Sequence, residues 1–379
     1  MKITVAILNN NINSLKGFIL KIFTAIFFIA IIIAFCFSIK YIKVSPNILN
    51  FASNIRQAEK NDMTISSIIS YSYPIFNSKN YIFIANKKNN DTQVVRQDDD
   101  KELLNKLDEM VSEDKINSVQ VVAKNDQKNL NITDTDNLQK ISIYNVNILN
   151  YSNERSLDFD SLFSRVITLT KTSDSILLYN THTSESYSNS DRYKFEYDGT
   201  YRSRNSEYNM LKITEQMKEY LSEKSFNVKH DTTPHDYGTY NSSYSNSRKT
   251  VKSDLIEMGN VGLSIDVHRD AAGDLTYGPT VEINGVTVAQ CMIVLGVGTD
   301  TLSNPYWQDN LSFALQFQKL ANSYYPGLFK PMLVRNSVYN QDLNKFSILI
   351  EIGATGNTID QALLSTKCLT NVLNLMYKN

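Results

Sequence analysis

Two of the four histidines and one glutamate stand where runs of apolar residues end. His182 follows the run 176–179, His268 follows the run 261–267, and Glu351 lies near the end of 346–352. Neutral imidazoles and carboxylates are ligands that zinc takes, and three protein ligands leave a fourth position for water. Zinc lowers the pKa of that water to about 7, so that it becomes a nucleophile at neutral pH. The pattern predicts a zinc site, with Glu351 accepting the water's proton or steadying the transition state.

Each of these residues also has a purely structural interpretation. A histidine after a strand is often a hydrogen-bonded polar residue, and Glu351 can pair with Arg269 or Arg335. The H-x-x-E spacing of His182 and Glu185 is weak evidence by itself. His230 and His235 lie in a polar loop, where we expect surface or substrate-facing roles and at best reserve ligands. Two loops rich in Tyr, Ser, Asn and Arg, 187–206 and 231–247, are expected to border the site and suit an extended, hydroxyl-rich and amide-rich ligand.

The elements that must position these residues alternate along the second part of the chain. Apolar residues at spacings of three and four predict helices over 208–224, 246–258, 308–324 and 358–377. Between them lie strand-like runs at 176–179, 226–228, 261–267, 288–297, 331–334 and 346–352. Continuously apolar strands that alternate with amphipathic helices predict an α/β fold with a mostly parallel sheet and helices on both faces. In such sheets ligands bind beyond the carboxyl ends of the strands.

The segment before this domain divides into an anchor and a stalk. Residues 22–38 carry no charge, and with 17–20 they reach the roughly 20 residues that span a bilayer. We expect an uncleaved transmembrane anchor in 1–43; a cleaved signal peptide is the alternative, but no clear cleavage site is present. Residues 44–140 are polar and predict a stalk or small accessory region, with one helix near 101–112 and strand-like runs at 81–85 and 118–122. The predicted catalytic domain is 141–379.

Composition excludes some classes of protein. The chain has 38 basic and 39 acidic residues, so its charge does not favour nucleic acid as the main partner. Three cysteines are too few for a disulfide scaffold or a Cys-rich zinc site. Cys36 falls in the anchor. Cys291 and Cys368 lie in apolar patterns and are expected to be core thiols, with pairing between them as the alternative.

Several ordered motifs resemble one known family. They are THTSESY, DYGTYNSSYSNSRKTV, SIDVHRDAAG, LGVGTDTLSNPYWQDNLSFALQFQKLA and LIEIGATGNTIDQA. Over 141–379 the chain resembles the stage II sporulation protein P family, which is similar to the zinc-dependent N-acetylmuramoyl-L-alanine amidases; the anchor and stalk agree in layout only.

The resemblance implies that His182 and His268 bind zinc and that Glu351 is the catalytic glutamate. The carboxylate ligand is Glu185, from the sporulation-type motif, or Glu207, which could open the first helix as in the broader amidase family. Arg248 and Arg269 resemble motif positions near the site and are expected to hold substrate carboxylates.

The resemblance also implies a function and a location. Family members cleave the amide between N-acetylmuramic acid and L-alanine of peptidoglycan during forespore engulfment, and some cleave peptide cross-links as an endopeptidase. The implied partners are sporulation protein D, a lytic transglycosylase, and sporulation protein M, a membrane protein. We therefore expect a single-pass protein of the mother-cell membrane with its catalytic domain outside the cytoplasm, facing the septal wall. The alternatives are a non-catalytic peptidoglycan-binding scaffold and a zinc carbohydrate deacetylase.

Overall fold

The computed structural model describes residues 90–112, 131–135, 138–152, 156–196, 200–238, 240–271 and 275–378. The predicted anchor in 1–43, the strand-like runs at 81–85 and 118–122, and Cys36 lie outside these residues. None of the helices within the described ranges has the length and hydropathy needed to cross a membrane. The chain divides into two compact units, Met1–Val94 and Val95–Asn379, and the features below belong to the second.

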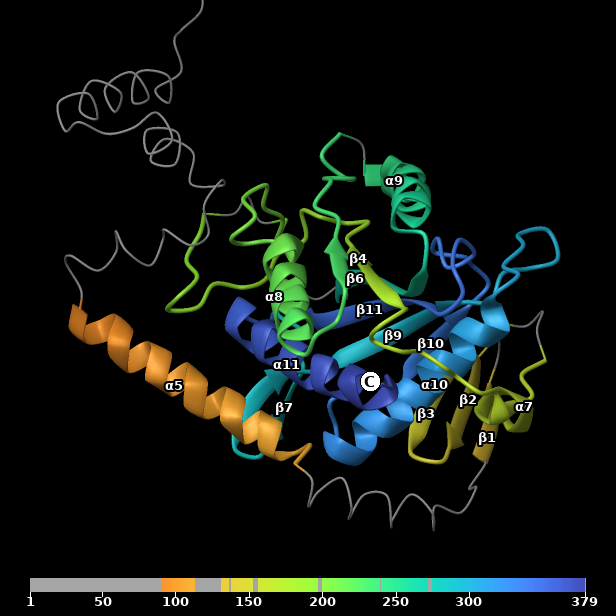
Figure 1. Ribbon diagram of the computed structural model, residues 1–379, viewed down its shortest axis with the longest axis horizontal. Helices are drawn as coiled ribbons and strands as arrows, with labels where there is room; N and C mark the ends of the chain where they lie inside the picture. The colour runs from red at the N-terminus through yellow and green to blue at the C-terminus, as the bar shows by residue number, and fades with distance from the viewer. Residues whose placement is uncertain are drawn as a thin grey trace, which may run out of the picture. The chain divides into compact units, whose positions relative to one another are not determined.

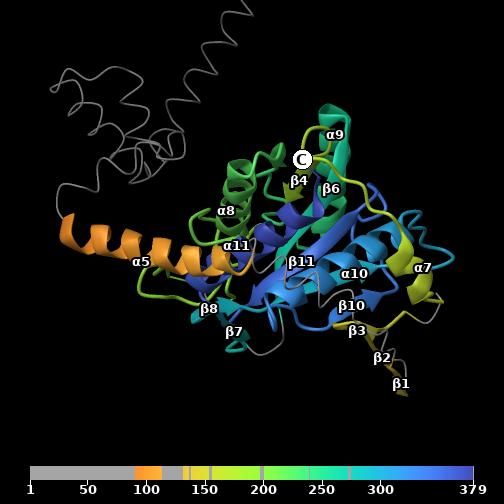
Figure 2. The same ribbon diagram turned by 60° about the horizontal axis from the view of Figure 1, so that its bottom comes forward.

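A nine-stranded sheet forms the centre of this unit, with strand order β1-β2-β3-β10-β9-β11-β6-β4-β5 (Figure 1). The six strands that surround the predicted site are β4 (Ser175–Tyr179), β5 (Val228–His230), β6 (Val261–Asp270), β9 (Cys291–Gly296), β10 (Met332–Arg335) and β11 (Ser347–Ala354). The sheet continues at one end as β3 (Val146–Asn150), β2 (Leu138–Ile143) and β1 (Asn131–Thr135), which follow β10 outward in Figure 2.

The sheet is mixed, which corrects the expectation of a mostly parallel one. Five of its pairings are parallel and three are antiparallel. β11 runs parallel to β6 but antiparallel to β9. Its two neighbouring strands therefore point in opposite directions. A buried apolar strand has the same composition in either direction, and the sequence pattern therefore did not reveal this reversal.

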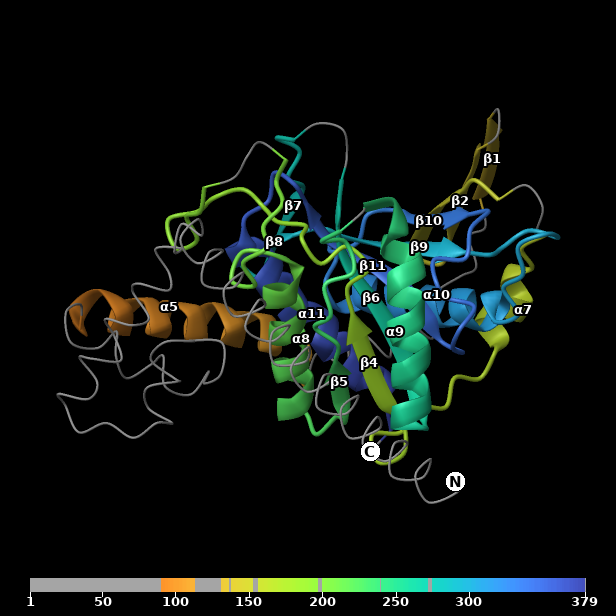
Figure 3. The same ribbon diagram turned by 90° about the horizontal axis from the view of Figure 1, so that it is seen from above.

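Helices cover both faces of the sheet, as expected. One face carries α8 (Met210–Glu223), α10 (Trp307–Tyr324) and α11 (Ile359–Met376), while α9 (Ser243–Met258) packs against β4 on the other (Figure 3). The alternation of β4 explains this division, because successive side chains of a strand point to opposite faces. Ile176 and Leu178 belong to the main core, whereas Leu177 and Tyr179 pack with Val251 of α9.

The smaller elements complete the unit. β7 (Thr280–Ile283) and β8 (Val286–Ala289) form a separate hairpin, and α7 (Phe159–Ser164) packs against α10. The predicted strand 288–297 is therefore two strands, because the chain passes from β8 into β9 at Gln290. Cys291 and Cys368 are buried free thiols, as expected from their patterns.

The compact unit begins before the predicted boundary at residue 141. Helix α5 (Asn90–Glu109) covers the helix expected near 101–112, and its Leu107 is fully buried in the main core. The hydroxyl of Tyr325 donates a hydrogen bond to the carbonyl of Leu107 at 2.9 Å. From Val95 onward, α5 thus belongs with β1 and β2 to the second compact unit.

Candidate functional site

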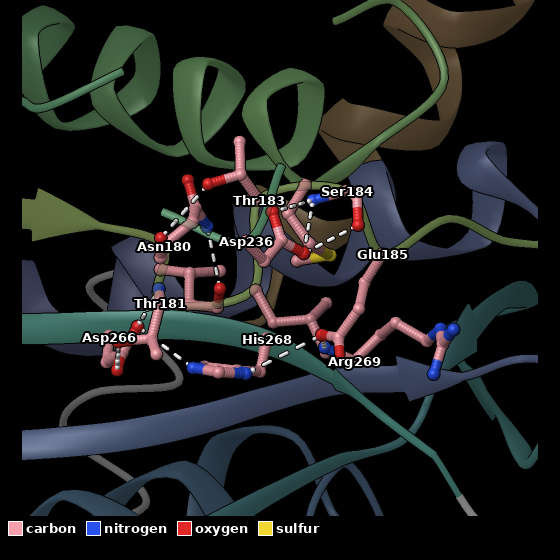
Figure 4. Close-up of polar contacts among 12 residues, drawn as sticks. Asn180, Thr181, Thr183, Ser184, Glu185, Asp236, Asp266, His268 and Arg269 are labelled. Carbon is pink, nitrogen blue, oxygen red and sulfur yellow. Dashed lines mark hydrogen bonds and ion pairs between the residues drawn. The ribbon is translucent and has the colours of Figure 1, made fainter. Parts of the chain in front are cut away.

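The candidate site lies at the carboxyl ends of β4 and β6, where β11 runs beside them. His182 stands in the turn that follows β4, and His268 lies near the end of β6. Glu351 of β11 is the register partner of His268 in the adjacent parallel strand. Figure 4 shows His268 between two carboxylates, those of Glu185 and Asp266. The sheet thus brings together side chains from segments that are far apart in the sequence.

His182 is buried and surrounded by aromatic rings. It is 8% exposed, its ring stacks on Tyr240 with centroids 4.4 Å apart, and the ring of Tyr244 meets its edge at 5.6 Å. The ring of His268 lies 5.2 Å away at a steep angle. Nδ1 of His182 is buried and has no hydrogen-bond partner among the residues that the structure describes. Burial lowers the pKa of His182, which favours the neutral imidazole that a metal requires.

His268 contacts two buried carboxylates. Its Nδ1 lies 3.5 Å from Oε2 of Glu185 and its Nε2 lies 2.9 Å from Oδ1 of Asp266. Burial alone would lower the pKa of His268, but the charges of Asp266 and Glu185 raise it well above its usual value. For Glu185, burial by itself would raise the pKa of the carboxyl group. His268 and the nearby cations outweigh burial and lower this pKa below its usual value. His268 thus lies between two buried carboxylates.

Glu351 is the polar exception in an apolar strand. It retains some exposure while its neighbours in β11 are buried. Its Oε2 is nevertheless shielded from solvent, and no described residue forms a hydrogen bond with it. Burial raises the pKa of Glu351 to about 8. A carboxyl group with a pKa near neutrality is suited to accept and return a proton.

The side chains fit zinc by type and spacing. A tetrahedral zinc ion with Zn–N bonds of about 2.0–2.1 Å places the centroids of two liganding imidazoles about 5 Å apart, and neighbouring donor atoms about 3.4 Å apart. The ring separation of 5.2 Å and the 3.5 Å between Glu185 and His268 agree with these values. Within the described residues, however, no three His, Cys, Asp or Glu side chains are already gathered so that they could hold a metal ion.

A hydrogen-bond network supports the turn that carries His182. Oδ1 of Asp266 accepts from the backbone N–H of Thr181 at 2.8 Å, and its Oδ2 accepts from the Thr181 hydroxyl at 2.7 Å. The amide of Asn180 donates to the carbonyl of Val267 at 2.6 Å. Asp236 accepts from both the backbone N–H and the hydroxyl of Ser184. These hydrogen bonds connect the turn to β6 on one side and to the loop of Asp236 on the other.

Comparison with known proteins identifies the family. Residues 64–374 match the family model of stage II sporulation protein P. The chain belongs to this family. Stage II sporulation protein P of Bacillus subtilis (strain 168) is 29% identical over 143 residues, which are 36% of this chain and 34% of the relative. The match thus spans about a third of that protein's length.

Solved amidases give weaker matches to this member of the stage II sporulation protein P family. The CwlD amidase of Clostridioides difficile, solved in complex with the GerS lipoprotein, has a TM-score of 0.33 and 12% identity, over 53% of this chain and 96% of that one. The N-acetylmuramoyl-L-alanine amidase AmiC2 of Nostoc punctiforme has a TM-score of 0.33 and 7% identity, over the same shares.

In this family member, the two candidates for the carboxylate ligand lie in different surroundings. Glu185 is 2% exposed and contacts His268. Glu207 is largely exposed and pairs with Lys212 at 3.1 Å. Of the two, Glu185 is the one that lies beside His268.

The two arginines expected to bind substrate are both engaged within the protein. Arg248 forms a two-bond pair with Asp342, at 2.7 and 2.6 Å. Arg269 is buried, and its guanidinium donates to the carbonyls of Ser186 and Tyr201. Their role in substrate binding stays a prediction.

The side chains of His230 and His235 are buried, which corrects the expectation that they lie on the surface. Nδ1 of His230 lies 2.7 Å from Glu215 of α8, and the His230 side chain is 1% exposed. His235 is 2% exposed. Its Nδ1 donates to the carbonyl of Asn180 at 2.8 Å, so its Nε2 is free to accept from the Thr250 hydroxyl at 3.0 Å.

Sequence reasoning missed three charged residues of the site: Asp266, Asp236 and Arg202. Asp266 had a visible signal, because it is an acidic residue within the otherwise apolar run 261–267, two positions before His268. Residues two apart in a strand share a face. Asp236 and Arg202 come from polar loops, and no local pattern separates them from other loop residues.

Proposed function

We propose that this chain is a zinc-dependent N-acetylmuramoyl-L-alanine amidase, which hydrolyses the amide between N-acetylmuramic acid and the L-alanine of peptidoglycan stem peptides. The observation that carries the proposal is the meeting of His182, Glu185, His268 and Glu351 at one edge of the sheet. Membership of the stage II sporulation protein P family supports a role in cell-wall hydrolysis during sporulation.

The roles of the side chains follow from their chemistry. His182, His268 and Glu185 would hold the zinc, which when bound supplies a Lewis acid that polarises the amide carbonyl and eases the deprotonation of water. Glu351 accepts a proton from the attacking water and returns it to the nitrogen as the carbon–nitrogen bond breaks. The products are a carboxylate on the muramic acid lactyl group and a peptide with a free N-terminal amine.

The setting of this activity is also part of the proposal. An N-terminal membrane anchor in 1–43 would hold the enzyme in the mother-cell membrane with the catalytic unit facing the septal wall. Sporulation proteins D and M are the proposed partners, and engulfment of the forespore is the proposed process. If the amidase acts first, the lytic transglycosylase would receive glycan strands that have lost their peptides.

The test is the digestion of purified peptidoglycan by the full chain in detergent, with products read by mass spectrometry. We use the full chain because α5 and β1 belong to the compact unit that carries the site. Release of stem peptides with free L-alanine amines is expected, with loss on treatment with a zinc chelator and recovery when zinc is restored. Full activity in protein freed of metal would contradict the zinc mechanism.

Other products would indicate other functions. Sedimentation of the protein with the cell wall, without new amine ends, would indicate a binding scaffold. Release of acetate with stem peptides left in place would indicate a carbohydrate deacetylase. Cleavage between stem peptides, in addition to L-alanine release, would add an endopeptidase activity.

A further inference from the structure

Arg202 is fixed beside Glu185 by the backbone. The two residues form an isolated antiparallel bridge, in which Ser186 N–H donates to the Tyr201 carbonyl at 3.0 Å and Ser203 N–H donates to the Ser184 carbonyl at 2.8 Å. Residues opposite each other in such a bridge have adjacent side chains. The position of Arg202 relative to the candidate metal ligand is therefore set by main-chain hydrogen bonds.

The guanidinium of Arg202 forms hydrogen bonds at Nη1 and packs with one face against an aromatic ring. Its Nη1 donates to the Ser184 hydroxyl at 3.0 Å and to Oδ2 of Asp236 at 3.1 Å. The guanidinium carbon lies 4.5 Å from the centroid of Tyr240, the same ring that stacks on His182. Arg202, Tyr240 and His182 thus form one column at the edge of the site.

The edge of this guanidinium formed by Nε and Nη2 donates no hydrogen bond to any described residue. Within the described part of the chain, its hydrogen bonds all come from Nη1, and Nη2 has a contact of 3.8 Å with Oε1 of Glu185. The side chain is 29% exposed. Nε and Nη2 form the parallel pair of donors that grips a carboxylate in two hydrogen bonds. In contrast, Arg248 already has such a partner in Asp342.

We propose that Arg202 binds a carboxylate of the wall peptide next to the scissile amide. This inference rests on the proposed function. If Glu185 holds the metal through a bond of about 2 Å, the 3.8 Å contact between Nη2 of Arg202 and Oε1 of Glu185 places Nη2 within about 6 Å of the metal. An extended chain advances about 3.3–3.6 Å per residue, so the carboxylate belongs to the first or second residue of the peptide. Arg202 would then select peptides in which that carboxyl group is free.

The test compares two soluble muramoyl dipeptides that differ in one group: the second residue carries a free carboxylate in one and a primary amide in the other. Binding by calorimetry and release of the dipeptide are both measured with the full chain. The unaltered protein should prefer the carboxylate form by at least about tenfold. Arg202→Gln should reduce this preference to near one, with the loss in KM rather than kcat.

Two further variants separate binding from a structural role. Arg204→Gln removes a neighbouring arginine that contacts the Tyr237 ring and carbonyl, and the preference should remain. Arg202→Lys keeps the charge beside Asp236 but lacks the two-donor edge. Compared with Arg202→Gln, this variant should have a melting temperature close to that of the unaltered protein. It should recover little of the preference for the carboxylate dipeptide. Full recovery of the preference by lysine would overturn the proposal.

The outcomes distinguish this inference from the proposed function. Preferential binding of the carboxylate form without any hydrolysis supports the role of Arg202 and contradicts the amidase. Hydrolysis of both dipeptides at equal rates, with equal affinities, supports the amidase and overturns the role of Arg202.

Discussion

Glu351 of β11 and His268 of β6 are register partners in two adjacent parallel strands. The sheet, rather than a loop, therefore sets the distance between the proposed catalytic carboxylate and a proposed metal ligand. Sites built on strands hold their geometry more closely than sites built on loops. His182 and Glu185 come from a turn, and the bonds of Asp266 and Asp236 to that turn restrain it.

Glu351→Gln should abolish peptide release while leaving the fold intact. Glutamine has nearly the same shape but cannot accept the proton of water, and loss of a general base typically costs about 10²–10⁴-fold. Glutamine also conserves the volume of Glu351 and removes a carboxyl group whose charged form burial disfavours, so the fold should be retained. Rates on peptidoglycan and melting curves measure the two effects. Glu282→Gln, on the exposed side of β7, is the matched control; an active Glu351→Gln protein would exclude the assigned role.

Glu185→Gln should weaken zinc binding, whereas Glu207→Gln should not. Glu185 is buried beside His268, and Glu207 is exposed and paired with Lys212. Competition with a chromophoric chelator measures the zinc affinity of each variant directly, without reliance on activity. The reverse result would assign the carboxylate ligand to Glu207.

Asp266→Asn should lower zinc affinity by about 10–100-fold, the usual cost of losing a carboxylate that orients a metal-binding histidine. Asp266 lies 2.9 Å from His268 Nε2 and also binds Thr181, so it restrains both strand ends. Asp254→Asn removes another buried carboxylate, paired with Lys229 on the far side of α9. Competition with a chelator measures the zinc affinity of both variants. Equal losses of zinc affinity would indicate general destabilisation rather than a specific role of Asp266.

Leu107→Ala should destabilise the compact unit by about 2–5 kcal/mol, because Leu107 of α5 is fully buried in the main core. Asn105→Ala, at an exposed position of the same helix, should change the free energy of unfolding by less than about 0.5 kcal/mol. Urea unfolding of the two variants measures the difference. Equal stabilities would show that α5 is a detached stalk after all.

The sequence predicted the elements and the neighbourhood of the site more completely than the site itself. Helices α8, α9, α10 and α11 lie within about three residues of their predicted limits, because the burial of one helical face imposes a local period. His182, His268 and Glu351 were found together since strand ends can be recognised locally. Arg202 and Asp236 were not, because their importance comes from contacts with Ser184, which is 18 and 52 residues away from them in the sequence.

The amino-acid sequence by itself determined the α/β character, the positions of the helices and the residue types available for a metal site. The tertiary structure decided the direction of β9 against β11, the burial of His235, and the choice of Glu185 over Glu207 as the carboxylate beside His268. The physical reason is that periodicity records whether a face is buried, whereas a polar side chain takes its role from partners that the fold brings from distant segments. The identity of those partners cannot be read from the periodicity of the local sequence.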